Sequence, residues 1–221
     1  MWALGRLPII LKHPQLYEVS QKVEGLIGLS LGFLLYKTVL NTKSHSQNVV
    51  EVGAYKGAST VYLSLAAHKV GKRVKSFELF SGLPTSDSLL DPGFYPGQYS
   101  SEVAEYEQQV ANYGIRDVVD LVIGDARQTL LPAIENEGFC VAFLDVDVYE
   151  VTKELLYQLW SIARGNETII VHDVNSPGVR KAIDQLHAFS ANVILETVAE
   201  QGTTSILHIP ESTRKPGTSA Q

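Results

Sequence analysis

Short apolar runs alternate with segments of helical periodicity along most of the chain. The run 49–52 is β-branched and brief, which is typical of a buried parallel strand, and Ala58, Val61 and Leu65 then recur at helical spacing. This alternation predicts an α/β fold, a doubly wound and mainly parallel sheet with one antiparallel strand at 203–209. The seven runs predicted as strands are 49–52, 73–78, 118–123, 141–144, 168–171, 193–198 and 203–209.

Two helical patterns precede the first strand, at 15–23 and 25–40, and Pro14 marks the start of the first. An extension of this kind commonly covers the ligand site of an α/β domain. With 221 residues, the chain is long enough for one such domain with a sizeable core. We expect a helical extension or lid at 1–46, the α/β domain at 47–210 and a disordered tail rich in Ser, Thr and Pro at 211–221.

Charge and composition narrow the class of protein. A formal net charge of −6 argues against a general binder of nucleic-acid backbones. The most apolar segment, 25–36, is shorter than the roughly 20 residues that a membrane span needs, and no secretory signal pattern is present. The only cysteine, Cys140, lies in an apolar run and is predicted to be a buried thiol. We expect a cytoplasmic protein with a small-molecule partner, without nucleic acid or a stable membrane span; a homo-oligomer is left open.

The stretch NVVEVGAYKGAST, residues 48–60, joins the first strand to a helix through two glycines. Glycine lets the backbone approach a ligand closely, and the unpaired N–H groups at a helix N-terminus suit a carboxylate or a phosphate. The spacing is Glu51-x-Gly53-x-x-x-Gly57, which differs from the G-x-G-x-x-G of dinucleotide-binding folds. Two glycines alone also fit a simple tight turn, so the assignment of a ligand site depends on the ends of the later strands.

Acids stand where the next two strands end. Glu78 closes the strand 73–78 and is placed to accept hydrogen bonds from ribose hydroxyls, because ligands of open α/β sheets bind outside the carboxyl ends of strands. Asp125 comes after the strand 118–123 and is expected to contact an adenine, to cap the next helix, or both. The long polar loop 80–99 between them carries several aromatic residues, which could line a substrate pocket or simply hold the loop in place.

A second group of polar residues stands after the fourth and fifth strands. Asp145 and Asp147 come directly after 141–144, and His172, Asp173 and Asn175 come after 168–171. The carboxyl ends of parallel strands meet at one edge, so these side chains are expected to converge there. Carboxylate oxygens with an imidazole suit a hard divalent ion such as Mg²⁺ or Mn²⁺. Helix capping explains each residue separately, but a polar active site explains the set better.

With these motifs the chain resembles the macrocin O-methyltransferase family. Members of that family are metal-assisted class I methyltransferases that use S-adenosylmethionine and act largely on sugar or natural-product hydroxyls. The resemblance covers roughly 49–189 and rests on EVGAYKGAS, SFELFSGLP, GDARQTLLP, FLDVDVYE and VHDVNSPGVRKAID. It implies a Rossmann-like seven-stranded sheet, S-adenosylmethionine as cofactor, and a divalent cation, with Mg²⁺ expected. Where the family pattern commonly has two adjacent aspartates, this chain has His172-Asp173.

The resemblance also implies roles for individual residues. The family's cofactor motif corresponds to the glycine turn and to the acids at the ends of the next two strands. The family's metal ligands correspond to the acids after strands four and five. Either Asp147 or His172 could take the proton of the acceptor hydroxyl. The predicted cofactor site is Glu51, Gly53, Tyr55, Gly57, Ser59, Glu78, Asp125 and Asp145; the predicted metal ligands are Asp145, Asp147 and Asp173; and the predicted catalytic residues are Asp147 and His172.

Two other functions compete with methyl transfer. Tyr149-x-x-x-Lys153 has the spacing of the catalytic pair of short-chain dehydrogenases, which would make the protein a nicotinamide-dependent oxidoreductase. That pair, however, starts a helix directly after two aspartates, and no G-x-G-x-x-G precedes it. A catalytically silent protein that only binds S-adenosylmethionine is the other alternative, and the intact acids at both strand ends argue against it.

Overall fold

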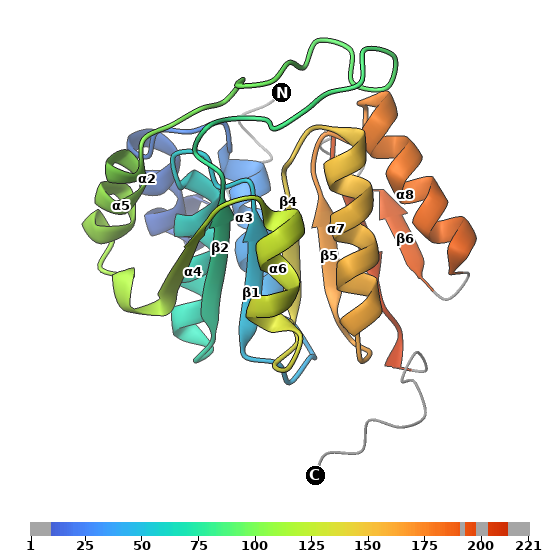
Figure 1. Cartoon of the computed structure of the whole chain (residues 1–221). Coiled ribbons are helices and arrows are strands. Elements are labelled where there is room, and N and C mark those ends of the chain that lie inside the picture. The colour runs from blue at the N-terminus through green and yellow to red at the C-terminus, as the bar shows by residue number, and fades with distance from the viewer. Residues whose placement is uncertain (1–9, 191–192, 198–202, 212–221) are drawn as a thin grey trace.

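The computed structural model describes residues 10–190, 193–197 and 203–211, and these form one seven-stranded sheet with helices on both faces (Figure 1). The strand order is β3-β2-β1-β4-β5-β7-β6, and β7 runs antiparallel to both of its neighbours. The predicted doubly wound sheet with one antiparallel strand is therefore confirmed. The strands are β1 (Asn48–Val52), β2 (Arg73–Glu78), β3 (Val119–Ile123), β4 (Val141–Leu144), β5 (Thr168–Val171), β6 (Ile194–Thr197) and β7 (Ser205–His208).

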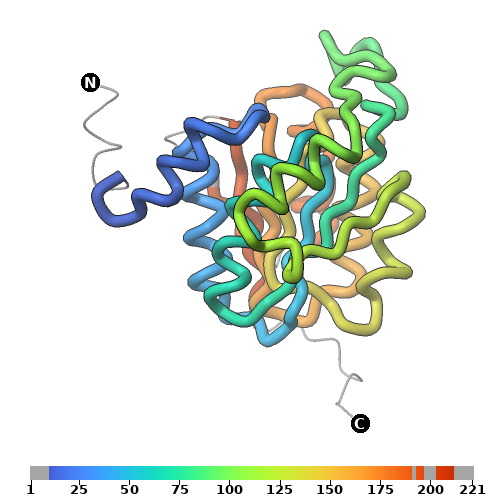
Figure 2. Tube along the Cα trace, turned by 90° about the vertical axis from the view of Figure 1, so that its left-hand side faces the viewer, coloured from blue at the N-terminus to red at the C-terminus, as the bar shows by residue number. Residues whose placement is uncertain are grey.

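Helices cover the sheet in two groups, with α6, α7 and α8 on one face and α2 to α5 on the other (Figures 1 and 2). All five residues of β1 are buried, as expected for a central parallel strand. Val50 packs with the first group and Val49 with the second. The helices are α2 (Pro14–Lys22), α3 (Leu29–Leu40), α4 (Ala58–Lys69), α5 (Val103–Asn112), α6 (Ala126–Ile134), α7 (Tyr149–Ile162) and α8 (Pro177–Phe189), with a 3₁₀ turn at Arg116–Val118.

The N-terminal helices share a core with the α/β domain. Gly32 of α3 lies against the ring of Tyr62 of α4, where a Cβ would collide with the ring, so this glycine lets the two helices approach closely. Helix α3 begins at Leu29, four residues later than predicted, because Gly25 has a φ of 156° and Gly28 is extended. The first nine residues of the predicted extension and the predicted tail from 212 onward lie outside the described residues.

The segment between β2 and α5 passes over the carboxyl ends of the strands and reaches the first turns of α7 and α8 (Figure 1). Its two limbs are paired, since Leu83 N donates to Gln98 O and Gly97 N donates to Leu83 O, both at 2.9 Å. Gly178 N of α8 donates to Leu90 O at 2.7 Å. The loop is thus ordered by its own backbone and fixed at its far end.

None of the helices in the described ranges is long and apolar enough to cross a membrane.

Candidate active site

A cavity of about 290 Å³ lies at the carboxyl edge of the sheet, where the strand order reverses between β1 and β4. This is where ligands of open α/β sheets bind. The strand ends form its floor, and the segment 25–27 and the loop after β2 form its walls. Of the predicted site residues, those that line it are Gly53, Tyr55, Ser59, Glu78, Asp125, Asp145, Asp147, His172 and Asp173; Glu51 and Gly57 do not.

The two glycines of the turn after β1 have different tasks. Gly53 has a φ of 86°, and a Cβ there would collide with the backbone oxygen of Asp145. Only glycine therefore lets β1 pass this close to the end of β4. Gly57 has a φ of 91° and precedes α4, with the ring of Tyr106 3.0 Å from the position of a Cβ. Gly57 shapes the turn from outside the cavity.

Glu51 is fully buried behind the glycine turn. Its Oε2 accepts hydrogen bonds from Thr60 Oγ1 at 2.6 Å and Ser76 Oγ at 2.7 Å, which joins β1 to α4 and β2. Its Oε1 has no hydrogen-bond partner within the described part of the chain, and burial raises the pKa of this carboxyl. Side chains alternate along a strand, and position 51 faces α4 rather than the cavity edge. The structure thus places Glu51 behind the glycine turn, where it supports the turn and does not line the cavity.

Glu78 does reach the cavity. Its Oε2 accepts from Tyr55 N at 2.6 Å, and its Oε1 accepts from Leu79 N at 2.7 Å and Phe80 N at 3.0 Å. Burial raises the pKa of Glu78, and these backbone donors counteract the rise. A carboxylate has about four acceptor positions, so Glu78 holds the glycine turn and the loop start together and keeps capacity for a ligand.

Asp125 caps α6, as predicted. It accepts a hydrogen bond from Arg127 N at 3.0 Å, and the guanidinium of the same residue lies 2.5 Å from Oδ2. Hydrogen bonds from Arg127 hold the pKa of Asp125 below its usual range. The carboxylate is therefore ionised and fixed at the cavity wall.

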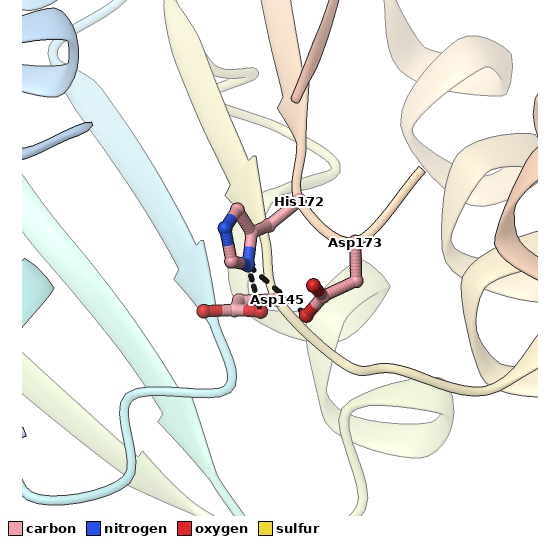
Figure 3. A group of neighbouring side chains, drawn as sticks. All are labelled: Asp145, His172 and Asp173. Atoms are coloured by element: carbon pink, nitrogen blue, oxygen red, sulfur yellow. Dashed lines mark hydrogen bonds and ion pairs between the residues drawn. The ribbon is translucent and has the colours of Figure 1, made fainter. Parts of the chain in front are cut away.

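Three side chains meet between β4 and β5 (Figure 3). His172 Nδ1 lies 3.1 Å from Asp145 Oδ1 and 3.1 Å from Asp173 Oδ2. One potential metal-ligating atom from each residue falls within 4.8 Å of the others. The predicted convergence is present for Asp145, His172 and Asp173, and Asp147 lines the same cavity, but Asn175 is exposed and does not line it. In the group of potential ligands, His172 occupies the place where Asp147 had been expected.

The ionisation of this cluster is set by its charges. Burial lowers the pKa of His172, but hydrogen bonds and charge from Asp145 and Asp173 outweigh it and raise the pKa to about 10. Burial also acts against the ionised form of Asp173, yet the hydrogen bond from His172 leaves its pKa lowered. Burial and the charge of Asp145 raise the pKa of Asp147 to about 8. At neutral pH, His172 is thus protonated and lies between the carboxyl groups of Asp145 and Asp173.

Four non-glycine residues of the cavity wall have left-handed backbones. They are Tyr55, Tyr99, Asp147 and Asp173, with φ between 51° and 63°. Left-handed geometry costs roughly 1–2 kcal/mol for a residue with a Cβ, and such residues cluster at functional sites. The rings of Tyr55 and Tyr99 meet edge to face, with centroids 6.3 Å apart, beside the acids. No sequence pattern had singled out Tyr99 from the other loop aromatics.

Asp91 in the loop is a second residue that sequence reasoning missed. It is buried, and its Oδ1 accepts from Tyr149 N, at the start of α7, at 2.8 Å. Its Oδ2 accepts from Asp87 N, also at 2.8 Å. Asp91 stands before a proline in a polar loop, as many surface aspartates do, so nothing in the sequence marked it.

The Tyr149–Lys153 pair does not line the cavity. The Tyr149 hydroxyl hydrogen-bonds to Gln185 Oε1 at 2.9 Å, and Lys153 Nζ lies 5.3 Å from the centroid of the tyrosine ring. A dehydrogenase would need this tyrosine beside its substrate. The oxidoreductase alternative therefore finds no support in the geometry.

A sheet of this order with a cavity at its switch point defines the class I methyltransferase fold. The family model described as a methyltransferase domain matches residues 50–174, more than half of the chain. The chain belongs to this family, and is a methyltransferase of the S-adenosylmethionine-dependent class, as predicted.

Solved structures show the same fold. The calicheamicin methyltransferase CalS11 superposes with a TM-score of 0.67 and 17% identity, covering 93% of this chain and 83% of that one. The O-methyltransferase NovP gives 0.67 and 21%, covering 83% and 81%. TomG from Streptomyces achromogenes, an O-methyltransferase of tomaymycin synthesis in complex with S-adenosylmethionine, gives 0.62 and 16%, covering 88% and 89%. A comparison with curated protein sequences gave no match.

Proposed function

We propose that the protein is an S-adenosylmethionine-dependent O-methyltransferase, assisted by a divalent metal, that methylates a hydroxyl of a sugar or natural-product small molecule. The observation that carries this proposal is one cavity that joins the glycine turn and Glu78 to the acidic cluster after β4 and β5. The macrocin-type motifs of the sequence and the O-methyltransferase activity of NovP and TomG support transfer to oxygen.

The cavity fits the cofactor. When bound, S-adenosylmethionine supplies an electrophilic methyl group on a sulfonium. Gly53 lines the cavity and lets the turn after β1 pass close to the end of β4, and Glu78 keeps acceptor capacity for ribose hydroxyls. Asp125 stands at the end of β3 for the adenine, and the ionised acids give the cavity a negative potential that suits a cationic ligand.

The cluster of Asp145, His172 and Asp173 fits a divalent cation. Two carboxylates and an imidazole are a donor set that suits Mn²⁺ and, with added water, Mg²⁺. When bound, the cation supplies positive charge that orients an acceptor hydroxyl and stabilises its ionised form. His172 would then give up its proton and act as a ligand. Asp147 faces the same cavity, and we assign it as the group that accepts the proton of the hydroxyl.

Asp147 suits that role better than His172. Because its pKa is raised to about 8, its ionised form is a stronger base than an ordinary aspartate. The pKa of His172 is raised further, to about 10, so near neutral pH a smaller fraction of His172 than of Asp147 is free to accept the proton. The chain itself thus binds the methyl donor, orients the acceptor and removes its proton.

Calorimetry with S-adenosylhomocysteine and with NAD tests the cofactor assignment. We expect the first ligand to bind and the second to bind more weakly or not at all; tighter binding of NAD would overturn it. Incubation with S-adenosylmethionine and a panel of sugar and phenol acceptors, with and without Mg²⁺, then tests turnover by release of S-adenosylhomocysteine. Cofactor binding without turnover on every acceptor would favour the catalytically silent alternative.

A further inference from the structure

A short segment before α3 closes one side of the cavity. We call residues 24–27 the arm; three of its residues, Gly25, Leu26 and Ile27, line the cavity. Leu26 is 69% exposed although it is apolar, so it offers surface that a bound ligand would cover. The arm belongs to neither α2 nor α3, and its backbone groups need partners from elsewhere.

One side chain, Gln109 of α5, supplies those partners. Its Oε1 accepts from Glu24 N at 2.6 Å, and its Nε2 donates to Glu24 O at 2.9 Å. The same Nε2 also donates to Lys56 O in the glycine turn. Both donors and the acceptor of the amide are thus used to join the arm to the turn after β1. Figure 2 shows α5 on the same side of the molecule as the N-terminal helices.

The ion pairs nearby do not explain this junction. Lys56 Nζ lies 3.0 Å from Glu24 Oε2 and 3.5 Å from Glu105 Oε1, but the Glu24 side chain is 74% exposed. Exposed pairs of this kind contribute little to stability. The approach of the arm instead needs glycine at position 25, where a Cβ would lie 2.5 Å from the Cβ of Ala58 in the first turn of α4.

We propose that Gln109 is a positioning residue for the cofactor site. It holds the arm against the glycine turn, so that Leu26 and Ile27 form a wall against which the methyl donor packs. Gln109 itself does not line the cavity. The inference rests on the proposed function, since it assumes that the cofactor occupies this cavity.

Binding of S-adenosylhomocysteine, measured by calorimetry well below the melting temperature, tests the inference without a methyl acceptor. Gln109→Met keeps the length of the side chain but removes all three hydrogen bonds. We expect its Kd to rise about tenfold, which corresponds to the net worth of one or two hydrogen bonds. Gln108→Met, at the exposed neighbouring position of α5, is the matched control and should leave the Kd unchanged.

Gly25→Ala should displace the arm by a steric clash with Ala58 and leaves Gln109 in place. It tests whether the position of the arm affects cofactor binding if Gln109→Met does not fold. Its control is Gly28→Ala, because a Cβ at position 28 meets nothing within 4 Å. We expect Gly25→Ala to weaken binding and Gly28→Ala not to. In the double variant the losses of Gly25→Ala and Gln109→Met should be less than additive, since both release the same arm.

The outcomes separate the inference from the proposed function. If the wild-type chain does not bind S-adenosylhomocysteine, the proposed function fails and the inference fails with it. If the wild type binds and Gln109→Met binds equally well, the inference alone is overturned. A loss of affinity that only accompanies a fall in melting temperature, and vanishes when both proteins are measured fully folded, would also overturn it.

Discussion

Acidic residues that look alike in the sequence have different environments in the structure. Glu51 is buried and one of its oxygens has no partner among the described residues, Glu78 accepts three backbone hydrogen bonds, and Asp125 is paired with an arginine. Burial and the charge of the neighbouring Asp145 raise the pKa of Asp147. Each side chain can therefore be tested by the property that its surroundings change.

Glu51 should make the protein less stable as the pH rises. Burial raises the pKa of its carboxyl in the folded state above that in the unfolded state. The stability it contributes is then fully present below the ordinary glutamate pKa and is lost as the pH rises through the folded value. Glu51→Gln removes this loss. In urea unfolding, its stability relative to wild type should increase from pH 4 to pH 8.

Glu154→Gln, at an exposed position of α7, serves as the control for that comparison. A stability difference between Glu51→Gln and wild type that is constant across the pH range would contradict the assignment of a raised pKa to Glu51.

Asp147 should govern the pH dependence of methyl transfer. Because its pKa is about 8 in the cation-free protein, the fraction able to accept a proton rises as the pH passes through that value. A bound cation favours the ionised carboxylate, so Mg²⁺ should shift the rising limb of the rate profile to lower pH. Asp147→Asn should lower kcat by about a hundredfold or more, the usual contribution of a general base.

The rate profile of His172→Gln distinguishes the two candidate bases. If Asp147 is the base, the rising limb persists in this variant, although the cation binds less tightly. Disappearance of the limb in His172→Gln, with Asp147→Asn retaining it, would reverse the assignment.

The elements themselves were largely predictable. All seven strands lie where the apolar runs placed them. The central strands β1, β4 and β5 were the clearest, because a parallel strand that is buried on both faces must be largely apolar. Boundaries were less certain: the third strand starts at Val119, one residue later than predicted and after a 3₁₀ turn, and α3 starts at Leu29, four residues later than predicted. Helix starts depend on capping and on loop contacts, such as that of Asp91 with Tyr149 N, which come from distant parts of the chain.

The loop after β2 should open when its far end is released. Asp91 ties it to the start of α7, and a Cβ on Gly178 of α8 would collide with the Asp91 carboxylate. Leu89, which is 86% exposed, offers a chymotrypsin cleavage site in the loop. Asp91→Ala should raise the rate of cleavage there about fivefold, in line with the cost of roughly 1 kcal/mol for a lost helix cap.

Two further variants refine this test. Gly178→Ala should speed cleavage as well, whereas Gly28→Ala should not, because a Cβ at position 28 meets no neighbour. Asp91→Asn keeps one acceptor oxygen for Tyr149 N and should fall between Asp91→Ala and wild type. Equal cleavage of wild type and Asp91→Ala would show that the loop is held by its other contacts.

At the scale of the whole molecule, the site is assembled from segments that are distant in sequence. The strand-end residues were predictable, since parallel strands deliver their carboxyl ends to one edge. The extension and the loop were expected near the site, but which of their residues form its walls was not predictable: the arm and Tyr99 reach the cavity through packing that no local pattern records. The motif predicted Glu51 at the cofactor, whereas its side chain points away from the cavity and bonds to Thr60 and Ser76.

This assembly also predicts how a cation acts on the folded protein. Asp145 and Asp173 follow the adjacent strands β4 and β5, so the proposed cation site would form only when these two strands are paired. An ion that binds the folded chain alone stabilises it, by about 2.7 kcal/mol at a free concentration a hundred times its Kd. Mg²⁺ or Mn²⁺ should therefore raise the melting temperature, and a chelator should reverse the rise while S-adenosylhomocysteine still binds.

Asp173→Asn is the decisive variant for the cation site. It removes one carboxylate charge, so the melting temperature should respond to Mg²⁺ only at much higher concentrations, and methyl transfer lost on chelation should not return at ordinary ones. Asp184→Asn, at an exposed position of α8, controls for the loss of a surface charge and should respond as the wild type does. Full methyl transfer after exhaustive chelation would contradict the metal site. His172 would then be the permanent cation of the cluster, and Asp147 would act as a base without help from a metal.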